Sequence, residues 1–274
     1  MDEFIRVEQL HKRYDLSEPW LARLIYRRPK RFLDAVDDVS FSIERGKTFA
    51  LVGESGSGKS TIARMTVGLL TPTRGRVLID EHDLHDEHLS QVEHRRIRQR
   101  LQMVFQSPYA SLNPRWRVGS ILAEPIRVFR LVENRDAEQA RVRELLEQVG
   151  LSASDARRYP HEFSGGQRQR ISIARALASK PDFIVCDEPT SALDVSVQAQ
   201  VLNLLKQLQR DLGLTYLFIT HNLAVVRVMA HRIGVLKSGK LVEEQDTEKL
   251  IESPQSDYTQ MLIRSAPRIH RAAS

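Results

Sequence analysis

The chain has 274 residues, of which 41% are hydrophobic, and it carries a formal net charge of +6. Its single cysteine, Cys186, excludes a disulfide framework and a cysteine-built zinc or iron–sulfur site. The first ten residues hold no apolar signal core, and no stretch reaches the ~18 apolar residues of a membrane span, so a soluble or peripheral protein is expected. The basic balance admits nucleic acid, an anionic membrane surface or polyphosphate as a partner without choosing among them.

Short strands separated by turn residues are expected over residues 4–14 and 36–52, the second ending in the apolar run FALV. GRVLID, at 75–80, predicts another strand. These segments predict a β-rich edge, and we place a parallel α/β core over roughly 46–72 and 160–230. The fold class expected is therefore α/β, with a P-loop core, an antiparallel β edge subdomain and a helical insertion subdomain.

Residues 88–160 are rich in Arg, Glu, Gln and Leu in helical patterns, and they predict the helical insertion. Two fully apolar strands follow, at 182–187 and 214–220, as is typical of strands buried on both faces of a parallel sheet. A helical pattern at 197–209 separates them. We expect one domain over 1–252 and a C-terminal extension over 253–274.

Residues 15–35 interrupt the first strands with a short apolar helical face followed by RRPKR. Two interpretations stay open here. The segment is either a helix lying on a membrane surface or an insertion packed on its own domain. The second is favoured because the apolar part is under three turns long.

GESGSGKST fits the phosphate-binding pattern G-x-x-x-x-G-K-[ST], directly after an apolar strand and before a helical pattern. Its glycines let successive backbone N–H groups converge on phosphate oxygens, and the helix N-terminus adds its positive dipole end. We expect Lys59 to reach the outer phosphates of ATP and Ser60 to ligate Mg²⁺. The predicted nucleotide-binding residues are Gly53, Glu54, Ser55, Gly56, Ser57, Gly58, Lys59, Ser60 and Thr61.

Polar side chains follow three further apolar runs. Asp187 and Glu188 end FIVCDE, where Asp187 is placed to hold Mg²⁺ and Glu188 to polarise the attacking water. His221 ends LFITH and is expected to donate to the γ-phosphate. Gln106 follows MVF, and its amide is a candidate contact to Mg²⁺ or to the attacking water.

SGGQ, at residues 164–167, offers a serine hydroxyl, bare backbone N–H groups and a helix N-terminus. Hydrolysis needs charge stabilisation on the side of the triphosphate that the P-loop leaves open. SGGQ is therefore predicted to be a second γ-phosphate contact. If the SGGQ of one molecule closes on the P-loop of another, the two molecules enclose two ATPs.

The P-loop, FSGGQRQR, FIVCDEPTSALD and ITH, in this order and spacing, resemble the nucleotide-binding subunit of an ABC transporter over nearly the whole chain. The resemblance implies the composite dimer site. It also implies that Tyr14 stacks on adenine, that Gln106 links the ATP site to membrane subunits, that Asp194 crosses the dimer and that His221 is the switch histidine. The matching signature residues are Ser164, Gly165, Gly166 and Gln167, and Phe163 stands where the family usually has leucine.

Three segments, at 105–115, 158–170 and 253–267, are similar to ATPase subunits of the oligopeptide/dipeptide permease group, which also includes nickel and glutathione importers. Ser256-Asp257 departs from the His-Pro that this group tends to have there. The resemblance, closer to the second, shorter ATPase subunit of such systems, implies ATP and Mg²⁺ as cofactors. It implies two integral-membrane permease subunits, a second identical or paralogous ATPase subunit and, indirectly, an extracytoplasmic solute-binding protein as partners. The implied location is peripheral, on the cytoplasmic face of the bacterial inner membrane.

The competing class is a soluble ABC-type ATPase that acts on nucleic acid. Repair and chromosome-structure members carry a long coiled coil between P-loop and signature, whereas here that interval is about a hundred residues without sustained heptads. The basic run EHRRIRQR, at 93–100, has no interleaved aromatics and is better explained as a solvated helix face. No nucleic-acid partner is expected.

Overall fold

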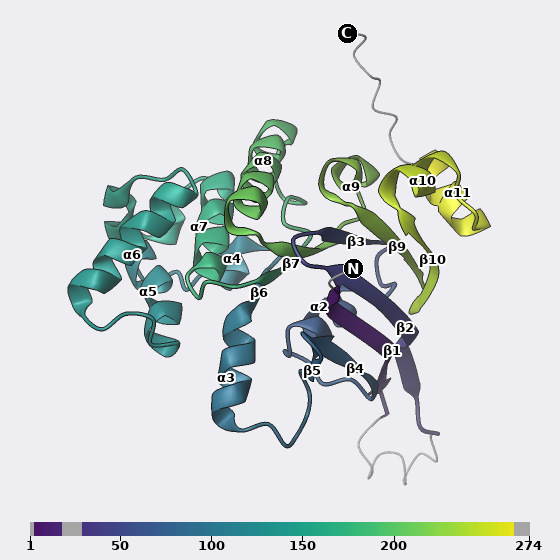
Figure 1. Cartoon of the computed structure of the whole chain (residues 1–274). Coiled ribbons are helices and arrows are strands. Elements are labelled where there is room, and N and C mark those ends of the chain that lie inside the picture. Colours follow the sequence, from purple (N-terminus) through teal and green to yellow (C-terminus); the bar gives the residue numbers. More distant parts are fainter. Residues whose placement is uncertain (1–2, 18–28, 266–274) are drawn as a thin grey trace.

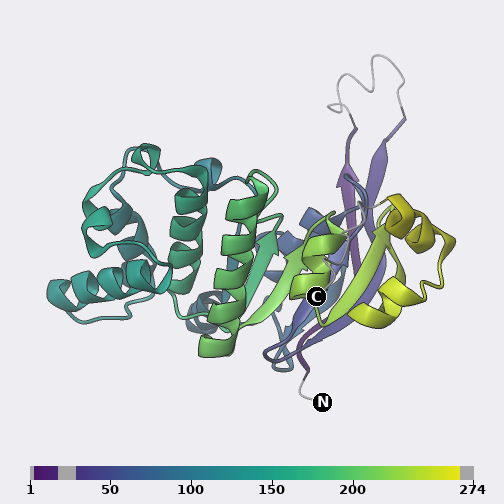
Figure 2. The same ribbon diagram turned by 90° about the horizontal axis from the view of Figure 1, so that it is seen from above.

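The computed structural model describes residues 3–17 and 29–265. Two sheets form its centre, helices gather at one end, and a long β-ribbon projects at the other (Figures 1 and 2). The predicted α/β fold with an antiparallel β edge and a helical part is confirmed. Within the described ranges, every helix is too short or too polar to traverse a lipid bilayer.

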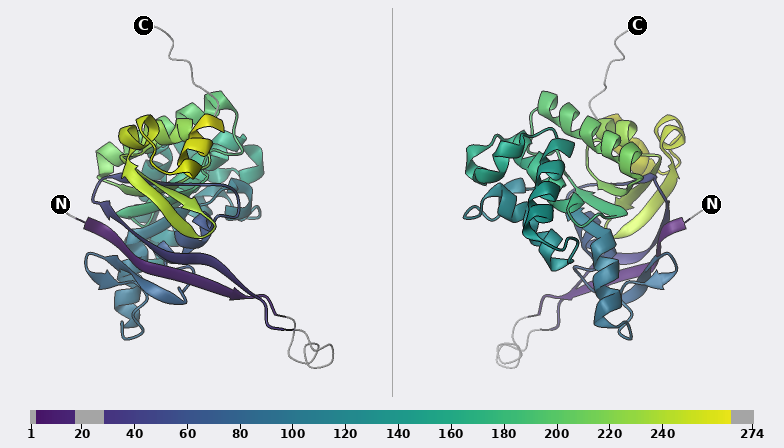
Figure 3. Two further views of the ribbon diagram at one scale, coloured as in Figure 1. Left: turned by 90° about the vertical axis from the view of Figure 1, so that its right-hand side faces the viewer. Right: turned by 60° about the vertical axis from the view of Figure 1, so that its left-hand side comes forward.

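The first sheet is antiparallel and has the order β2-β1-β4-β5. Its strands are β1 (Glu3–Asp15), β2 (Phe32–Glu44), β4 (Arg74–Ile79) and β5 (His82–Asp83). Strands β1 and β2 form the β-ribbon and pair along their whole length. Leu16 N donates to Arg31 O across the ribbon at 2.8 Å. Of the insertion expected at 15–35, Asp15 belongs to β1 and residues 32–35 belong to β2, so the strands reach further into this stretch than the sequence predicted (Figure 3). The helical face predicted at 20–25 lies outside the described residues.

The second sheet has the order β10-β9-β3-β8-β7-β6. Its strands are β3 (Thr48–Val52), β6 (Leu101–Val104), β7 (Phe183–Asp187), β8 (Thr215–Ile219), β9 (Arg232–Lys237) and β10 (Lys240–Asp246). All neighbouring pairs are parallel except β9 and β10, which form an antiparallel hairpin. β3, β7 and β8 are buried along their full length, as their unbroken apolar sequences predict.

The stretch expected to be a helical insertion differs from that expectation in one place. Its residues Leu101–Val104 form β6 and pair in parallel with β7, so this strand belongs to the core sheet. The helices of the stretch are α3 (Gln91–Arg100), α4 (Pro108–Ser111), α5 (Val118–Val128), α6 (Arg135–Gln148) and the 3₁₀ turns η1 (Ala153–Arg157) and η2 (Pro160–Glu162). The apolar run MVF before Gln106 marks the end of this strand, but β6 has only four residues and directly follows a helix rich in arginine, so its place in the core sheet could not be predicted.

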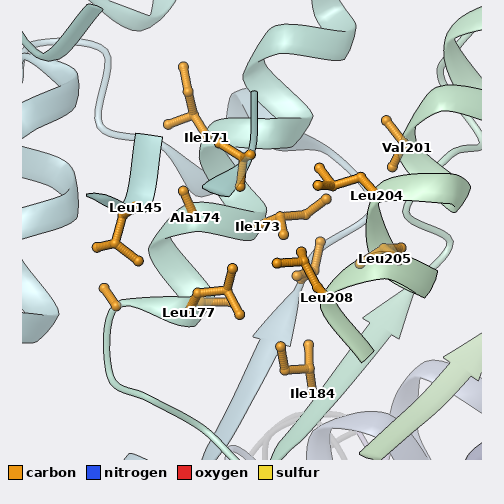
Figure 4. Packing of buried hydrophobic residues seen from close by; sticks show 14 of the residues in the cluster. Leu145, Ile171, Ile173, Ala174, Leu177, Ile184, Val201, Leu204, Leu205 and Leu208 are labelled. Carbon is orange, nitrogen blue, oxygen red and sulfur yellow. The ribbon is translucent and has the colours of Figure 1, made fainter. Parts of the chain in front are cut away.

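Both faces of the central sheet are covered. Adjacent residues of each strand point to opposite sides of the sheet, and those of β7 belong to two different apolar clusters. Ile184 and Cys186 of β7 face one cluster with α7 (Gly165–Leu177) and α8 (Val195–Leu212). Figure 4 shows this packing, with residues of both helices directed toward Ile184. Phe183 and Val185 face the opposite cluster, which includes α2 (Lys59–Thr66) and the antiparallel sheet. The sheet edge that bears the predicted motifs is thus held between two packed layers.

The remaining helices follow β8 in the sequence. They are α9 (Leu223–Met229), α10 (Thr247–Glu252) and α11 (Asp257–Ser265). A third apolar cluster joins Ala50 and Val52 of β3 to Leu250 of α10 and Tyr258 of α11. Helix α11 therefore packs back onto the strand that precedes the P-loop.

Candidate functional site

Four parallel strands carry the predicted site at their carboxyl ends. The P-loop follows β3, Asp187 and Glu188 stand at the end of β7, His221 follows β8, and Gln106 follows β6. Because these strands are parallel and adjacent, their carboxyl ends lie at one edge of the sheet, where open α/β sheets bind ligands. A cleft of about 680 Å³ lies at this edge. It is lined by Tyr14, Leu33, Ala35, Ser55, Gly56, Gly58, Lys59, Ser60, Thr61, Gln106, Glu188 and His221.

Two P-loop glycines are required by close backbone contacts. A Cβ on Gly53 would lie 2.1 Å from the carbonyl oxygen of Leu236, and one on Gly58 would lie 2.3 Å from that of Ala35. Both residues also have positive φ angles, +153° and +106°. Only glycine therefore lets the loop pass between β9 and the antiparallel sheet and still begin α2.

Lys59 is buried at the first position of α2 and is held by the loop itself. Its Nζ donates to the carbonyl oxygens of Gly53 at 2.9 Å and Glu54 at 2.7 Å. Burial lowers the pKa of Lys59, although the nearby carboxylates of Glu188 and Asp187 act in the opposite direction. An ammonium group that is held by carbonyl oxygens and has little access to water is suited to bind an anion such as a phosphate.

Ser60 and Asp187, both expected to hold Mg²⁺, face each other: Ser60 Oγ donates to Asp187 Oδ1 at 3.2 Å. Burial raises the pKa of Asp187, and the neighbouring Glu188 adds to this effect. A bound cation would stabilise the ionised carboxylate. Hydroxyl and carboxylate oxygens are the hard donors that Mg²⁺ prefers, and Mg²⁺ sites beside phosphates use one or two protein carboxylates. The residues present therefore fit this ion.

Glu188 contacts both of the other predicted catalytic groups. Gln106 Nε2 donates to Glu188 Oε2 at 3.1 Å, and His221 Nδ1 lies 3.0 Å from Oε1. The backbone of Glu188 has φ 46°, in the left-handed region that is unusual outside glycine. Such strained conformations cluster at functional sites. The structure thus brings Glu188, Gln106 and His221 into one group beside Lys59.

The wall of the cleft next to the ribbon includes residues that the sequence did not indicate. Tyr14 of β1 lines the cleft as expected, and its register partner Leu33 on β2 lines it too, as does Ala35. Leu33 is half exposed. The expectation that the second strand begins at residue 36 left both residues out. Leucine and alanine in a ribbon carry no chemical pattern that would have revealed them.

The SGGQ residues do not line this cleft in the same chain. Ser164 caps α7 in a reciprocal pair with Gln167: Ser164 Oγ accepts from Gln167 N at 3.3 Å, and Gln167 Oε1 accepts from Ser164 N at 3.0 Å. Gly165 is exposed at the helix N-terminus. Asp194 caps α8 through Val197 N at 3.0 Å and likewise lies outside the cleft lining. Within one chain, the signature residues and the cleft therefore form two separate surfaces.

This fold and these motifs define a nucleotide-hydrolysing cassette of the P-loop class. The family model described as "ABC transporter" matches residues 36–191, more than half of the chain. The chain belongs to the ABC transporter family, as its ATP-binding component, and it is an ABC-type ATPase.

Close relatives are transport proteins. Oligopeptide transport ATP-binding protein OppF of Bacillus subtilis (strain 168) is 51% identical over 239 residues, which is 87% of this chain and 78% of that protein. A putative peptide import ATP-binding protein of Brucella abortus (strain 2308) is 49% identical over 273 residues, 99% of this chain and 79% of that protein. These relatives give no support to the alternative of a nucleic-acid ATPase.

Solved structures agree with the fold. A dimeric post-hydrolysis state of the ATP-binding cassette MJ0796, bound to ADP and Pi, superposes with a TM-score of 0.73 at 30% identity. The match covers 89% of this chain and 98% of the MJ0796 chain. CbiO1 of Clostridium perfringens, part of the transporter complex cbiONQ, gives a TM-score of 0.75 at 26% identity and covers 92% of each chain.

Proposed function

We propose that this chain is the ATP-hydrolysing subunit of a bacterial importer that takes up peptides, or a related small polar solute, across the inner membrane. The grouping of Glu188, Gln106 and His221 beside a buried Lys59 carries the catalytic part of the proposal. The substrate class follows the names of the relatives that are about 50% identical, several of which are oligopeptide or peptide import ATP-binding proteins. The resemblance of the sequence to the second, shorter ATPase subunit of such systems adds the subunit type to this proposal.

The residues of the cleft have distinct roles in this proposal. Tyr14 stacks on adenine, the P-loop from Gly53 to Thr61 binds the phosphates, and Lys59 contacts the outer ones. Ser60, Asp187 and Gln106 would hold Mg²⁺, which would neutralise charge on the phosphate oxygens when bound. Glu188 accepts a proton from the attacking water. His221 donates to the γ-phosphate.

The signature completes the site in a dimer. Ser164, Gly165, Gly166 and Gln167 of one chain would meet the γ-phosphate held by the P-loop of a second chain, identical or paralogous. Asp194 would lie at the same interface. Support comes from the exposed position of Gly165 away from the cleft of its own chain, and from the dimeric state in which the related MJ0796 cassette was solved.

A second surface supports attachment to membrane subunits. A groove of about 510 Å³ lies between the core and the helical part, and its lining includes Leu69, Phe105, Val128 and Phe129. Leu69 and Val128 are 60% and 55% exposed and line the same groove, and exposed apolar side chains that lie together mark interaction sites. Phe105 precedes Gln106, so an apolar helix of a permease subunit in this groove would contact the chain beside the catalytic group.

The complete assembly in this proposal has two integral-membrane permease subunits and two ATPase subunits, with an extracytoplasmic solute-binding protein acting through the permease. The chain would lie peripherally on the cytoplasmic face of the inner membrane. Within it, residues 1–252 form one nucleotide-binding domain and 253–274 an extension.

Affinity purification of the tagged chain from native membranes in mild detergent tests the assembly. Two multi-span membrane proteins and a second ATPase are expected among the bound proteins. Val128→Glu in the groove should lose the membrane proteins, whereas the control Val242→Glu, at an exposed position on β10 outside the groove lining, should keep them. A purely soluble complex, or bound nucleic acid, would overturn the transporter assignment.

A further inference from the structure

The peptide unit between Gly53 and Glu54 is held from both of its ends. Its carbonyl oxygen, on Gly53, accepts from Lys59 Nζ at 2.9 Å. Its N–H, on Glu54, donates to the hydroxyl oxygen of Tyr258 at 3.4 Å. In a trans peptide the C=O and N–H point in opposite directions, so the two bonds together fix the rotation of this peptide plane.

Tyr258 reaches the P-loop from α11, far away in the sequence. Its side chain is only 8% exposed and packs in the cluster formed by Ala50, Val52 and Leu250. Lys237 Nζ lies 4.7 Å from the ring centroid, within range of a cation–π interaction. The ring is thus held among β3, β9 and α10, and its hydroxyl is directed at the loop that follows β3.

The start of α11 is fixed by a buried carboxylate. Glu243 of β10, only 9% exposed, accepts from Gln255 N at 2.8 Å through Oε1 and from Ser256 N at 3.0 Å through Oε2. These two N–H groups immediately precede α11, whose first residue is Asp257. The carboxylate therefore joins the helix to the sheet one turn before Tyr258.

The same helix also approaches the histidine side of the site. Leu262 and Ser265 of α11 line a cavity of about 410 Å³ together with Gly53, Glu54 and His221. Across this cavity, the helix therefore faces the two loops that flank the γ-phosphate position in the proposed nucleotide site. The position of α11 therefore affects both the P-loop and the loop that begins at His221.

We infer that Tyr258 is a positioning residue for nucleotide binding. By fixing the Gly53–Glu54 peptide, its hydroxyl holds the carbonyl that orients the Lys59 ammonium before ATP arrives. This inference rests on the proposed role of Lys59 at the phosphates. Without the hydroxyl, the peptide can rotate and Lys59 loses one of its two short backbone acceptors, so part of the ordering must occur on binding.

Tyr258→Phe tests the inference in the full chain with Mg²⁺, because it removes only the hydroxyl and keeps the buried ring. The Kd for ATP, measured by fluorescence titration, is expected to rise roughly three- to tenfold, which is the effect of one neutral hydrogen bond. kcat/KM should fall by a similar factor, while kcat at saturating ATP falls less than about twofold. Such a split between binding and turnover is not expected from a general loss of stability.

Tyr216→Phe is the matched control. Tyr216 is fully buried, and its hydroxyl donates to Leu205 O at 3.0 Å on the side of the sheet covered by α8. It should lower the melting temperature without changing the Kd for ATP. If Tyr258→Phe binds ATP as tightly as the wild type, or if both variants weaken binding equally, the inference is wrong.

Lys59→Ala distinguishes a failure of the role inferred for Tyr258 from a failure of the proposed nucleotide site. If Lys59→Ala loses ATP binding while Tyr258→Phe retains it fully, only the role of Tyr258 fails. If Lys59→Ala binds ATP as the wild type does, the nucleotide site itself is wrongly assigned.

Discussion

His221 and Glu188 are in direct contact, with Nδ1 of the imidazole 3.0 Å from Oε1 of the carboxylate. Gln106, which follows β6 on the other side of β7, donates to the second carboxylate oxygen, Oε2. The carboxylate is thus held between the ends of β6 and β8, and only 18% of its side chain is exposed. A held carboxylate with a free lone pair can orient a water and accept its proton.

Glu188→Gln should therefore abolish most of the ATPase activity. The amide keeps the size of the side chain but cannot accept the proton, so kcat is expected to fall by about 10²-fold or more, within the range of general-base catalysis. The Kd for ATP should change far less. Single-turnover hydrolysis by the assembled transporter measures the chemical step. Near-normal turnover would show that another group is the base; Glu144→Gln, on an exposed helix face, is the control.

The position of the proposed catalytic residues at one edge of the sheet can be predicted from the sequence for a geometrical reason. Each proposed catalytic side chain directly follows an apolar run, and parallel strands bring such positions to one edge. Leu33 and Tyr258 could not be found in this way. Leu33 reaches the cleft through the register of a ribbon, and Tyr258 meets Glu54 across 204 residues of sequence. Neither contact follows from residue type or local periodicity, because both depend on how distant elements pack.

Asp187→Asn is expected to stabilise the nucleotide-free protein while it impairs hydrolysis. Burial raises the pKa of Asp187, so the ionised carboxylate is less stable in the folded chain than in the unfolded one. Removing the charge should raise the melting temperature near pH 7, by about 2–4 °C for each kcal/mol regained. Thermal melting in EDTA measures this gain.

The stability gained by Asp187→Asn should depend on pH in a defined direction. A raised pKa costs stability only where the group would be ionised, so the gain should shrink as the pH falls toward the ordinary aspartate pKa of about 4. Asp194→Asn is the control. Hydrogen bonds from Val197 N and Ser196 lower the pKa of Asp194, so removing its charge should bring no gain. A gain for Asp187→Asn that grew on acidification would contradict the assignment.

Tyr14 should contribute to ATP affinity through its ring alone. It lines the cleft at the end of the ribbon, where an adenine would lie against the ring and Leu33. Stacking of a base on an aromatic ring is worth roughly 1–3 kcal/mol, so Tyr14→Ala should raise the KM for ATP by about five- to 150-fold. Tyr14→Phe should remain within about twofold of the wild type. Steady-state ATPase assays compare the two, and an equal loss in both variants would show that the hydroxyl, not the ring, is used.

The two adjacent signature glycines should respond differently to the same substitution. A Cβ on Gly166 would lie 2.3 Å from Val197 Cγ1, and both residues belong to packed helices. Gly166→Ala should therefore destabilise the fold by about 1–3 kcal/mol through overpacking. A Cβ on Gly165 meets only Leu193 Cδ2 at 3.5 Å, an ordinary contact, and the residue is exposed.

Gly165→Ala should consequently keep the melting temperature of the wild type and still lose ATPase activity, because the added methyl group would occupy the surface proposed to approach the γ-phosphate of a second chain. ATP binding to the P-loop of the same chain should be unchanged, since Gly165 does not line that cleft. Thermal melting, ATP titration and ATPase rate as a function of chain concentration distinguish these effects. A fully active Gly165→Ala protein would contradict the composite dimer site, whereas a loss of activity without any loss of stability or of ATP binding is the result that a contact between chains requires.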